Sequence, residues 1–453
     1  MSVPAVVIAA PASGTGKTTV ATGLIGALRR AGDRVAPFKV GPDFIDPGYH
    51  ALAAGRPGRN LDPVLVGADL IGPLYRHGTR DADVAVIEGV MGLFDGRISE
   101  PFRLPAAGST GEVAGLLVAP VVIVVDGRGQ SQSIAAVLHG FSTIDPGVRV
   151  AGVILNRVGT PRHEQVLRQA CESVGVPVLG ALPRLEELSV PSRHLGLVTA
   201  AEHGDRARDA VAAMTDLVSR HIDLDAVRAL AGSAVTSEPW SPREAVGAPV
   251  TGSPVVAIAA GPAFTFSYAE HAELLRAAGA EVVGFDPLRD TLPAQTAALV
   301  LPGGFPEQYP AELAANDAVR TEIRALAARA PVHAECGGLT YLMSDLDGHP
   351  MCGVLAGSAR FTATLTLGYR DAVAAGESVM FSTGQRVTGH EFHRTAVEFG
   401  TAVEPAWLIG GSAGDPVRDG AVCAGVHAGY LHTHPAGQPA AIRRFVEAAS
   451  ARV

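Results

Sequence analysis

The sequence predicts an α/β protein with two α/β domains in succession, the first of them built on a parallel sheet. Short apolar runs rich in β-branched residues alternate with helical stretches over residues 6–182, and a second alternation begins at residue 255. Continuous apolar strands separated by helices indicate a parallel sheet that is covered on both faces. The chain has 453 residues. Because domains usually have about 100–200 residues, a chain of this length is expected to form two to three domains, each with its own core.

In the first half of the chain, strands and helices are expected to alternate. Residues 6–10 form the first apolar run, and residues 18–31 carry apolar side chains at helical spacing. Further strands are expected at residues 35–39, 84–87, 121–125, 150–155 and 176–182, with a helix at residues 163–174. Chemistry in such folds lies at the carboxyl ends of the strands, so function is expected in the loops that follow them.

The second half repeats the alternation after a change of composition. The pattern weakens at residues 189–199, residues 202–230 are expected to be helical, and residues 232–254 have the Ser, Pro, Gly and Ala content of a linker. Strands are then expected at residues 255–260, 281–284, 298–301 and 331–334, helices at 269–278 and 311–328, and β-like segments at 360–369 and 385–399. We therefore expect one domain at residues 1–195, a helical segment and linker at 196–252, and a second domain at 253–448.

The composition excludes several classes of protein. The net charge is −9, whereas a nucleic-acid binder needs a basic excess. A hydrophobic content of 47% excludes a wholly disordered chain, and four cysteines without CxxC spacing indicate neither a disulfide framework nor a zinc site. The start lacks the basic region of a signal peptide, and the strongest apolar run, residues 118–125, is shorter than the ~20 residues that span a bilayer. We expect a soluble cytoplasmic protein.

A glycine-rich loop, APASGTGKTT at residues 10–19, lies between the first expected strand and the first expected helix. Glycines let backbone N–H groups turn toward phosphate, the lysine reaches the terminal phosphates, and the threonine after it can hold Mg²⁺. A plain glycine turn with an exposed lysine is the alternative, but the strand–loop–helix context favours nucleotide binding. The residues expected at the nucleotide are Gly14, Gly16, Lys17, Thr18 and Thr19.

Acidic residues follow the next two strands of the first half, in KVGPDFIDP at residues 39–47 and VIEGVMGLFDG at residues 86–96. Carboxylates at strand ends beside a phosphate loop suit Mg²⁺, which is held by one or two carboxylates plus phosphates. Turn formation explains Asp95 adequately. It explains Glu88 poorly, because a carboxylate that ends a buried strand needs a partner.

In the second half, Cys336 lies in HAECGGL, where a strand is expected to lead into a helix. Such an elbow lifts a thiol clear of the backbone beside a helix N-terminus, which lowers its pKa. The N–H of Gly337 can stabilise an oxyanion, and Gly304, in the loop at residues 301–307, can supply a second donor. A nucleophilic cysteine needs a histidine base, for which His432 is preferred over His434 and His427. The plain alternative, a buried structural cysteine, is assigned to Cys171, Cys352 and Cys423.

Together these motifs resemble one family, the glutamine-dependent a,c-diamide synthases of corrin biosynthesis. The resemblance covers essentially the whole chain and is carried by residues 10–19, 39–47, 88–96, 301–307, 334–339, 389–393 and 430–434. The first half looks like a P-loop domain of the dethiobiotin-synthetase type, and the second like a class I glutamine amidotransferase domain. The resemblance implies that ATP is split to ADP and phosphate, that glutamine supplies ammonia, and that side chains a and c of the corrin ring are amidated.

The resemblance also assigns roles to single residues. It implies that Asp43 and Asp95 lie near the reacting carboxylate and that Asn156 contacts adenine. The residues implied to serve ATP and Mg²⁺ are Lys17, Thr18, Lys39, Asp46 and Glu88. Conversion of the substrate carboxylate to an acyl phosphate is expected, since hydroxide or oxide is a poor leaving group.

Two positions depart from the expected patterns. Pro11 stands where the full P-loop pattern has glycine. Triad glutaminases carry an acid two positions after the base, but here that position is His434, so the third member is missing or comes from elsewhere and slow or partner-gated glutamine hydrolysis is expected. On a strand, His434 would share a face with His432 and could orient it in place of the acid.

A corrin substrate carries many carboxylates, so its pocket is expected to hold positive charge. His390, His393 and Arg394 are candidates, against an even alternative that the paired histidines are surface or satisfied core residues. The expected partners are hydrogenobyrinate or cobyrinate, ATP and glutamine, with no nucleic acid or membrane, and a homodimer is an assembly that the resemblance allows.

Other functions remain open at this stage. A partitioning-type ATPase would have a second lysine where Ala12 stands, and a regulatory protein with an inactive amidotransferase module would not need both Cys336 and His432. Cobyric acid synthase shares the domain order, but residues 43–47 and 389–393 favour the diamide synthase. Between the two ring substrates, the first half resembles enzymes of the cobalt-free route.

Overall fold

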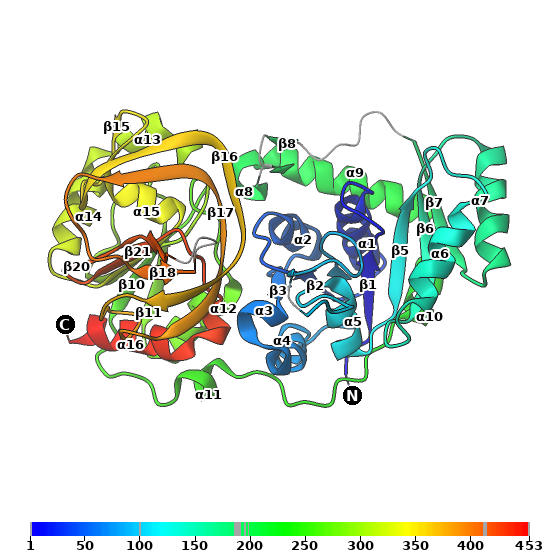
Figure 1. The fold of residues 1–453 in the computed structure, drawn as a ribbon, viewed down its shortest axis with the longest axis horizontal. Helices are drawn as coiled ribbons and strands as arrows, with labels where there is room; N and C mark the ends of the chain where they lie inside the picture. The colour runs from blue at the N-terminus through cyan, green and yellow to red at the C-terminus, as the bar shows by residue number, and fades with distance from the viewer. Residues whose placement is uncertain are drawn as a thin grey trace. The chain divides into compact units, whose positions relative to one another are not determined.

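The computed structural model describes residues 2–98, 101–184, 192–193, 196–197, 199–410 and 415–451. The chain divides into two compact units, Met1–Trp240 and Ser241–Val453, and each is an α/β unit, as the sequence predicts (Figure 1). The stretch at 189–199, where the apolar pattern weakens, lies largely outside the described residues. Among the residues that are described, the helices are too short or too polar to cross a membrane.

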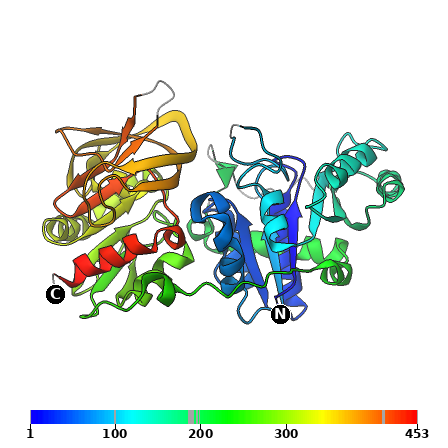
Figure 2. The same ribbon diagram turned by 60° about the horizontal axis from the view of Figure 1, so that its bottom comes forward.

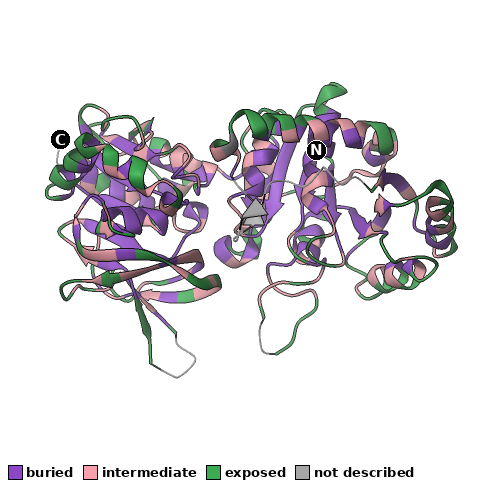
Figure 3. Cartoon of the chain, turned by 90° about the horizontal axis from the view of Figure 1, so that it is seen from above, coloured by how far each residue is buried: buried purple, intermediate pink, exposed green. Residues whose placement is uncertain are grey.

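Seven strands form the sheet of the first unit, in the order β3-β2-β4-β1-β5-β6-β7, and every neighbouring pair is parallel. Apolar runs without polar alternation produce this arrangement, because both faces of the sheet are covered by helices (Figure 3). The strands are β1 (Ala5–Ala9), β2 (Val35–Val40), β3 (Arg59–Leu61), β4 (Val84–Glu88), β5 (Val121–Asp126), β6 (Val150–Val158) and β7 (Val178–Pro183).

The helices of the first unit connect these strands and extend beyond the last of them. They are α1 (Lys17–Arg30), α2 (Asp46–Ala54), α3 (Pro63–Val66), α4 (Ile71–Gly78), α5 (Thr110–Leu117), α6 (Ile134–Thr143), α7 (Pro161–Ser173), α8 (Ala200–His203), α9 (Asp205–His221) and α10 (Leu224–Leu230). A short 3-10 turn, η1 (Ala68–Leu70), precedes α4, and β8 (Ser192–Arg193) pairs with β9 (Gly196–Leu197). The residues expected to be helical at 202–230 therefore belong to α8, α9 and α10, and α9 packs against α1.

The second unit contains two six-stranded sheets. The first has the order β11-β10-β12-β13-β21-β20 and is parallel except for β20 (Figure 2). Its strands are β10 (Val255–Ala259), β11 (Glu281–Phe285), β12 (Thr296–Leu301), β13 (Val332–Glu335), β20 (Ala421–Cys423) and β21 (Val426–Gly429). The other sheet comprises β14 (Met343–Leu346), β15 (His349–Pro350), β16 (Leu355–Ala374), β17 (Arg386–Phe399), β18 (Trp407–Ile409) and β19 (Val417–Asp419). The long antiparallel pair β16–β17 confirms the β-like segments that the sequence predicts.

The helices of the second unit differ from the expectation at two places. The helix expected at residues 311–328 is interrupted because the Asn316 side chain accepts from the Val319 N–H and starts a new helix. The expected linker contains α11, which begins after Ser241. The helices are α11 (Pro242–Val246), α12 (Ala269–Ala277), α13 (Pro310–Ala315), α14 (Asp317–Ala327), α15 (Gly337–Leu342) and α16 (Pro439–Ser450), with 3-10 turns η2 (Pro306–Gln308) and η3 (Pro435–Gly437).

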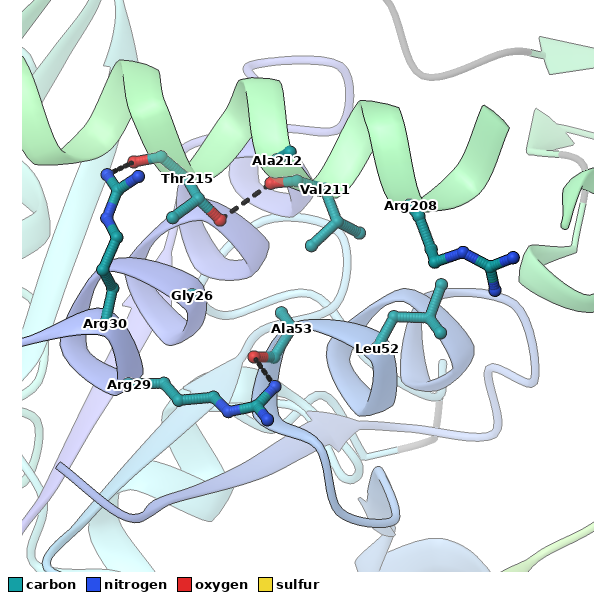
Figure 4. A pocket seen from close by; sticks show the side chains of 9 residues that line it. All are labelled: Gly26, Arg29, Arg30, Leu52, Ala53, Arg208, Val211, Ala212 and Thr215. Carbon is teal, nitrogen blue, oxygen red and sulfur yellow. Dashed lines mark hydrogen bonds between the residues drawn. The ribbon is translucent and has the colours of Figure 1, made fainter. Parts of the chain in front are cut away.

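Two glycines allow α1 to approach α9 closely. A Cβ atom on Gly23 would lie 2.4 Å from the carbonyl oxygen of Met214, and one on Gly26 would lie 2.1 Å from Oγ1 of Thr215. Figure 4 shows Thr215 on α9 close to Gly26 on α1, at one side of a pocket of about 370 Å³ that is also lined by Arg29. The close approach fixes α1, and with it the loop that precedes α1.

We predict that Gly23→Ala destabilises the first unit by about 1–3 kcal/mol, because the backbone of α9 cannot move away without loss of packing. Gly140→Ala is the matched control: Gly140 is exposed in α6 and a Cβ there meets nothing within 4 Å. This second change should stabilise by about 0.5–1 kcal/mol. Urea unfolding followed by circular dichroism measures both, and equal effects of the two changes would contradict the packing argument.

Candidate active sites

The loop after β1 has the backbone of a phosphate-binding loop. Gly14 and Gly16 have φ angles of 77° and 99°, which side chains rarely tolerate. The Lys17 ammonium donates to the carbonyl oxygens of Met91 at 2.5 Å and Ala12 at 3.3 Å. Burial lowers the pKa of Lys17 to about 8. A desolvated ammonium that donates to two carbonyl oxygens, one in its own loop and one in the loop after β4, is suited to bind a phosphate oxygen. Thr19, half-buried, follows on the same helix.

Asn156, at the end of β6, lies against this loop. Its Nδ2 atom donates to the Thr15 carbonyl oxygen at 2.7 Å, and a Cβ on Gly16 would lie 2.3 Å from the same nitrogen. Gly16 is therefore required both by its φ angle and by the approach of Asn156. The amide lies at the edge of the loop, where the resemblance predicts an adenine contact.

Buried charges gather at the carboxyl ends of β2 and β4. The Lys39 ammonium bonds Asp46 Oδ2 at 2.6 Å and Glu88 Oε1 at 3.0 Å. The Thr18 hydroxyl donates to Glu88 Oε1 at 2.7 Å, and His50 Nε2 lies 2.7 Å from Glu88 Oε2. Sequence reasoning missed His50, which α2 brings back over the sheet.

The pKa directions in this cluster follow from its contacts. Burial opposes the charge of Lys39, but Asp46 and Glu88 outweigh it and raise the pKa of Lys39. Burial also opposes ionisation of Glu88, but Lys39 and His50 lower the pKa of Glu88 below its usual range. Burial and the neighbouring Asp43 raise the pKa of Asp46. Glu88 is thus held as a carboxylate at neutral pH.

This donor set fits Mg²⁺ bound together with a nucleotide. The Thr18 hydroxyl lies 2.7 Å from Glu88 Oε1 and 3.4 Å from Asp46 Oδ2, so one hydroxyl and two carboxylates converge. Across the described parts of the chain, no three His, Cys, Asp or Glu side chains are arranged to hold a metal ion by themselves. Mg²⁺ is typically held by one or two carboxylates and completes its shell with phosphates and water.

Asp43 and Asp95 lie at the rim of the cluster. Asp43 Oδ1 accepts from the Ile45 N–H at 2.7 Å, and its Oδ2 lies 3.9 Å from the Lys39 ammonium. Asp95 is exposed and accepts from the Gly92 N–H at 2.9 Å. Each carboxylate thus accepts from the backbone of its own turn. Asp43 also faces the Lys39 ammonium, and the charge of Asp95 acts on Lys17 of the phosphate loop.

In the second unit, Cys336 occupies a strained elbow between β13 and α15. Its φ angle is 50°, its N–H donates to the Gly429 carbonyl oxygen at 2.7 Å, and its Sγ lies 3.7 Å from the Phe392 carbonyl oxygen. The side chain is buried. Burial, with Glu307 nearby, raises the pKa of Cys336 despite the Gly337 N–H. The lowering expected from the helix N-terminus is therefore outweighed by desolvation, and the resting thiol is protonated.

The two glycines expected to bind an oxyanion adjoin each other. A Cβ on Gly337 would lie 3.1 Å from the Gly304 nitrogen, so the two backbones approach closely. Gly304 has a φ of 158°, and a Cβ there would lie 2.1 Å from the Ala263 carbonyl oxygen. Side chains are excluded from both positions, which leaves backbone N–H groups beside the nucleophile.

His432 lies against Gly303, the residue before Gly304. A Cβ on Gly303 would lie 2.4 Å from His432 Cε1 and 3.2 Å from its Nε2. The His432 backbone exchanges two 2.9 Å hydrogen bonds with His390. The two other histidines considered as bases are placed differently: the His434 ring lies over Tyr268 at 4.1 Å, and His427 packs against Trp407 at 5.1 Å, both distances between ring centroids.

Two carboxylates that sequence reasoning missed hold the segment of the base. Glu335 Oε1 accepts from the N–H and hydroxyl of Thr433, both at 3.1 Å, and Glu335 Oε2 lies 3.7 Å from His432 Nδ1. Asp419 accepts from the Tyr430 N–H at 3.0 Å. The signal for Glu335 was present in the sequence, since it is an acid at the end of an expected buried strand, as Glu88 is.

The histidines at residues 389–393 lie inside the unit. Burial and the neighbouring His432 lower the pKa of His390 to about 3, so this ring is neutral. The His393 ring stacks on Tyr430 at 3.8 Å, and Glu391 pairs with Arg370 at 2.6 Å. Of the two readings of this segment, these contacts favour packing around the base over recognition of substrate carboxylates.

Comparison with known proteins follows the same division of the chain. Residues 6–198 match the family model described as the CobQ/CobB/MinD/ParA nucleotide binding domain, and residues 255–440 match the CobB/CobQ-like glutamine amidotransferase domain. The chain is 69% identical to the hydrogenobyrinate a,c-diamide synthase of Mycobacterium bovis, over 98% of both chains. It is 54% identical to the protein of that name from Streptomyces coelicolor, over 98% of this chain and 97% of the other. A cobyrinate a,c-diamide synthase of Gloeobacter violaceus is 41% identical, over 98% and 96%.

Buried histidines behind the second site predict acid sensitivity. The ring of His333 lies near two other histidine rings. Its centroid is 5.9 Å from that of His271 and 6.0 Å from that of His427. Burial lowers the pKa of His271 to about 4 and that of His427 to about 3, from 6.5. Unfolding therefore takes up protons below pH 6.5, and stability falls as the pH falls through this window.

We predict that the stability of the second unit decreases from pH 6.5 toward pH 4, by up to about 1.4 kcal/mol per pH unit for each such histidine. His427→Gln should reduce this slope, whereas His349→Gln, in the β14–β15 hairpin, should not. Urea unfolding at several pH values, followed by Trp407 fluorescence in a Trp240→Phe background, measures the slope. Equal slopes for the parent and His427→Gln would contradict the prediction.

Proposed function

The chain belongs to the family of the glutamine-dependent corrin a,c-diamide synthases, and we propose that it amidates the a and c carboxylates of hydrogenobyrinate with ammonia from glutamine, at the expense of ATP. The observation that carries the proposal is that one chain holds two complementary sites. The first unit has a phosphate loop beside buried carboxylates. The second has a buried cysteine followed by Gly337, which approaches Gly304, while His432 lies against Gly303. A cytoplasmic location and assembly as a homodimer belong to the same proposal.

The second site would release ammonia. The Cys336 sulfur attacks the amide carbon of glutamine while His432 takes the thiol proton, and the N–H groups of Gly304 and Gly337 stabilise the oxyanion. Ammonia leaves with the proton that His432 returns. Water then attacks the thioester, His432 again taking and returning a proton, and glutamate leaves.

The first site would use that ammonia. A substrate carboxylate oxygen attacks the γ-phosphorus of ATP, which gives an acyl phosphate and ADP, and ammonia then attacks the acyl carbon and displaces phosphate. Lys17 binds the phosphates, Asn156 contacts the adenine, and Asp43 and Asp95 border the carboxylate that reacts. Thr18, Asp46 and Glu88 would hold Mg²⁺, which neutralises the phosphate charge. Lys39 bridges the two carboxylates and favours the ionised form of Glu88.

The choice of ring substrate rests on the relatives. The relatives at 69% and 54% identity are named for hydrogenobyrinate, while one at 41% is named for cobyrinate. An ATP- and glutamine-dependent assay that offers the two acids side by side tests this choice. Preferential amidation of the cobalt-free acid is expected, and preference for the cobalt-bearing acid would overturn it.

We predict that Cys336→Ser lowers glutamine-dependent amidation by about 10³-fold or more. Free ammonium should still support amidation, because the phosphoryl-transfer site lies in the first unit. Cys423→Ser is the matched control, since this half-buried thiol in β20 should not affect either nitrogen source. Product is measured by chromatography with each nitrogen source, and loss of both activities in folded Cys336→Ser would contradict the separation of the sites.

We predict that Glu88→Gln lowers amidation by about 10²-fold or more with either nitrogen source, because phosphoryl transfer precedes the attack of ammonia. Glutamine hydrolysis without ring substrate should be retained. Glu164→Gln is the control, since Glu164 pairs with Arg168 on the surface of α7. ATP turnover is measured as a function of Mg²⁺ concentration, and near-normal turnover of Glu88→Gln at limiting Mg²⁺ is the result that would refute the assignment.

A further inference from the structure

The base of the second site lacks an acid at the usual position two residues later, where this chain has His434. We propose that Glu335, the residue directly before the nucleophile, is the carboxylate that orients His432 and stabilises its protonated form during glutamine hydrolysis. This inference rests on the proposed hydrolysis of glutamine by Cys336 and His432. Glu335 is a positioning residue, because it acts through His432.

The two nitrogens of the His432 ring face different groups. Nδ1 lies 3.7 Å from Glu335 Oε2, while the Cε1–Nε2 edge lies over Gly303, next to the glycine proposed to bind the oxyanion. A base whose Nδ1–H faces a carboxylate presents its free Nε2 lone pair to the nucleophile. The 3.7 Å distance is an ion-pair contact longer than a hydrogen bond, and catalytic contacts of this kind commonly shorten when the substrate binds.

The surroundings of Glu335 keep it ionised in spite of its burial. Burial opposes ionisation, but His432 and His333 outweigh it and lower the pKa of Glu335 to about 2. The His333 Nε2 atom lies 3.5 Å from Glu335 Oε1. The negative charge is therefore available to the imidazolium that forms at His432.

The same carboxylate also joins the segment of the nucleophile to that of the base. Glu335 Oε1 accepts from both the N–H and the hydroxyl of Thr433, the residue after the base. Glu335 is covalently adjacent to Cys336. One side chain therefore sets the position of the base relative to the sulfur, which an acid that follows the base on its own strand does not do.

His434 is the rival for the orienting role. Its Nδ1 accepts from the Ala436 N–H at 3.2 Å, within the turn that follows. Its ring lies over the ring of Tyr268 at 4.1 Å. These contacts anchor the turn at residues 434–436, and a neutral imidazole would stabilise a neighbouring imidazolium less than a carboxylate does.

The test compares variants that separate charge from anchoring. Glu335→Gln removes the charge, but its amide oxygen can still accept from Thr433. Thr433→Val removes the hydroxyl and keeps the charge, and His434→Asn keeps an acceptor for the Ala436 N–H. We expect Glu335→Gln to lower the kcat of glutamine hydrolysis by about 10²- to 10⁴-fold with little change in KM. Glu335→Asp should restore part of this kcat. Thr433→Val and His434→Asn should each lower kcat by less than about tenfold. A loss of less than about threefold in Glu335→Gln, or an equal loss in Thr433→Val or His434→Asn, would overturn the proposal.

A double-mutant cycle covers the case in which Glu335→Gln simply disturbs the fold. The rate at which iodoacetamide alkylates Cys336 is measured in the parent, Glu335→Gln, His432→Ala and the double variant. If Glu335 acts through His432, its substitution adds no further loss once His432 is absent; additive losses would overturn the proposal. All these assays are run both without and with ATP and the ring substrate. A parent chain that hydrolyses no glutamine under either condition would refute the proposed function, whereas hydrolysis unaffected by Glu335→Gln refutes this inference alone.

Discussion

Each unit is organised around one ionised glutamate at the carboxyl end of a buried parallel strand. Such a carboxylate is unfavourable unless cations or hydrogen-bond donors surround it, so its neighbours must come from several parts of the chain. Glu88 ends β4 and is surrounded by Lys39, Thr18 and His50. Glu335 ends β13 and is surrounded by Thr433, His432 and His333. In both units, the groups that stabilise the buried carboxylate are also residues of the candidate site.

The parallel register determines which groups can meet these carboxylates. Lys39 on β2 is the register partner of Glu88 on β4, which places an ammonium beside the carboxylate across one ladder step. In the second unit, Glu335 is the register partner of Gly429, and the chain leaving β21 brings His432 within three residues. Because strands of a parallel sheet end at the same edge, residues distant in sequence arrive at one place.

Several features could be predicted from the sequence, because each depends on local pattern and strand order. They are the alternation of strands and helices, the phosphate loop, and the approach of Gly304, Gly337 and His432 to the same region. His50, Glu335 and Asp419 could not be assigned, because their roles depend on which side chains the tertiary fold buries together. Asp419 lies at the end of the short strand β19, which carries no periodicity. Glu335 was not predicted, because the orienting acid was expected after the base. The argument used for Glu88, that a carboxylate at the end of a buried strand needs a partner, holds equally for Glu335. The single helix expected at residues 311–328 was wrong, because the Asn316 side chain accepts from the Val319 N–H and so caps a second helix.

The slow or gated glutamine hydrolysis expected from the missing acid stays a prediction, and the burial of the nucleophile is a second physical reason to expect it. Burial raises the pKa of Cys336, so the neutral thiol is the resting form of the nucleophile. Forming thiolate and imidazolium in this environment requires a charge that favours the imidazolium, and the carboxylate of Glu335 is ionised and close enough to supply it. Desolvation therefore opposes the formation of the Cys336 thiolate, and the carboxylate proposed to compensate for it is Glu335. Any event that shortens the contact between Glu335 and His432 would raise the reactivity, since the electrostatic stabilisation grows as the distance falls.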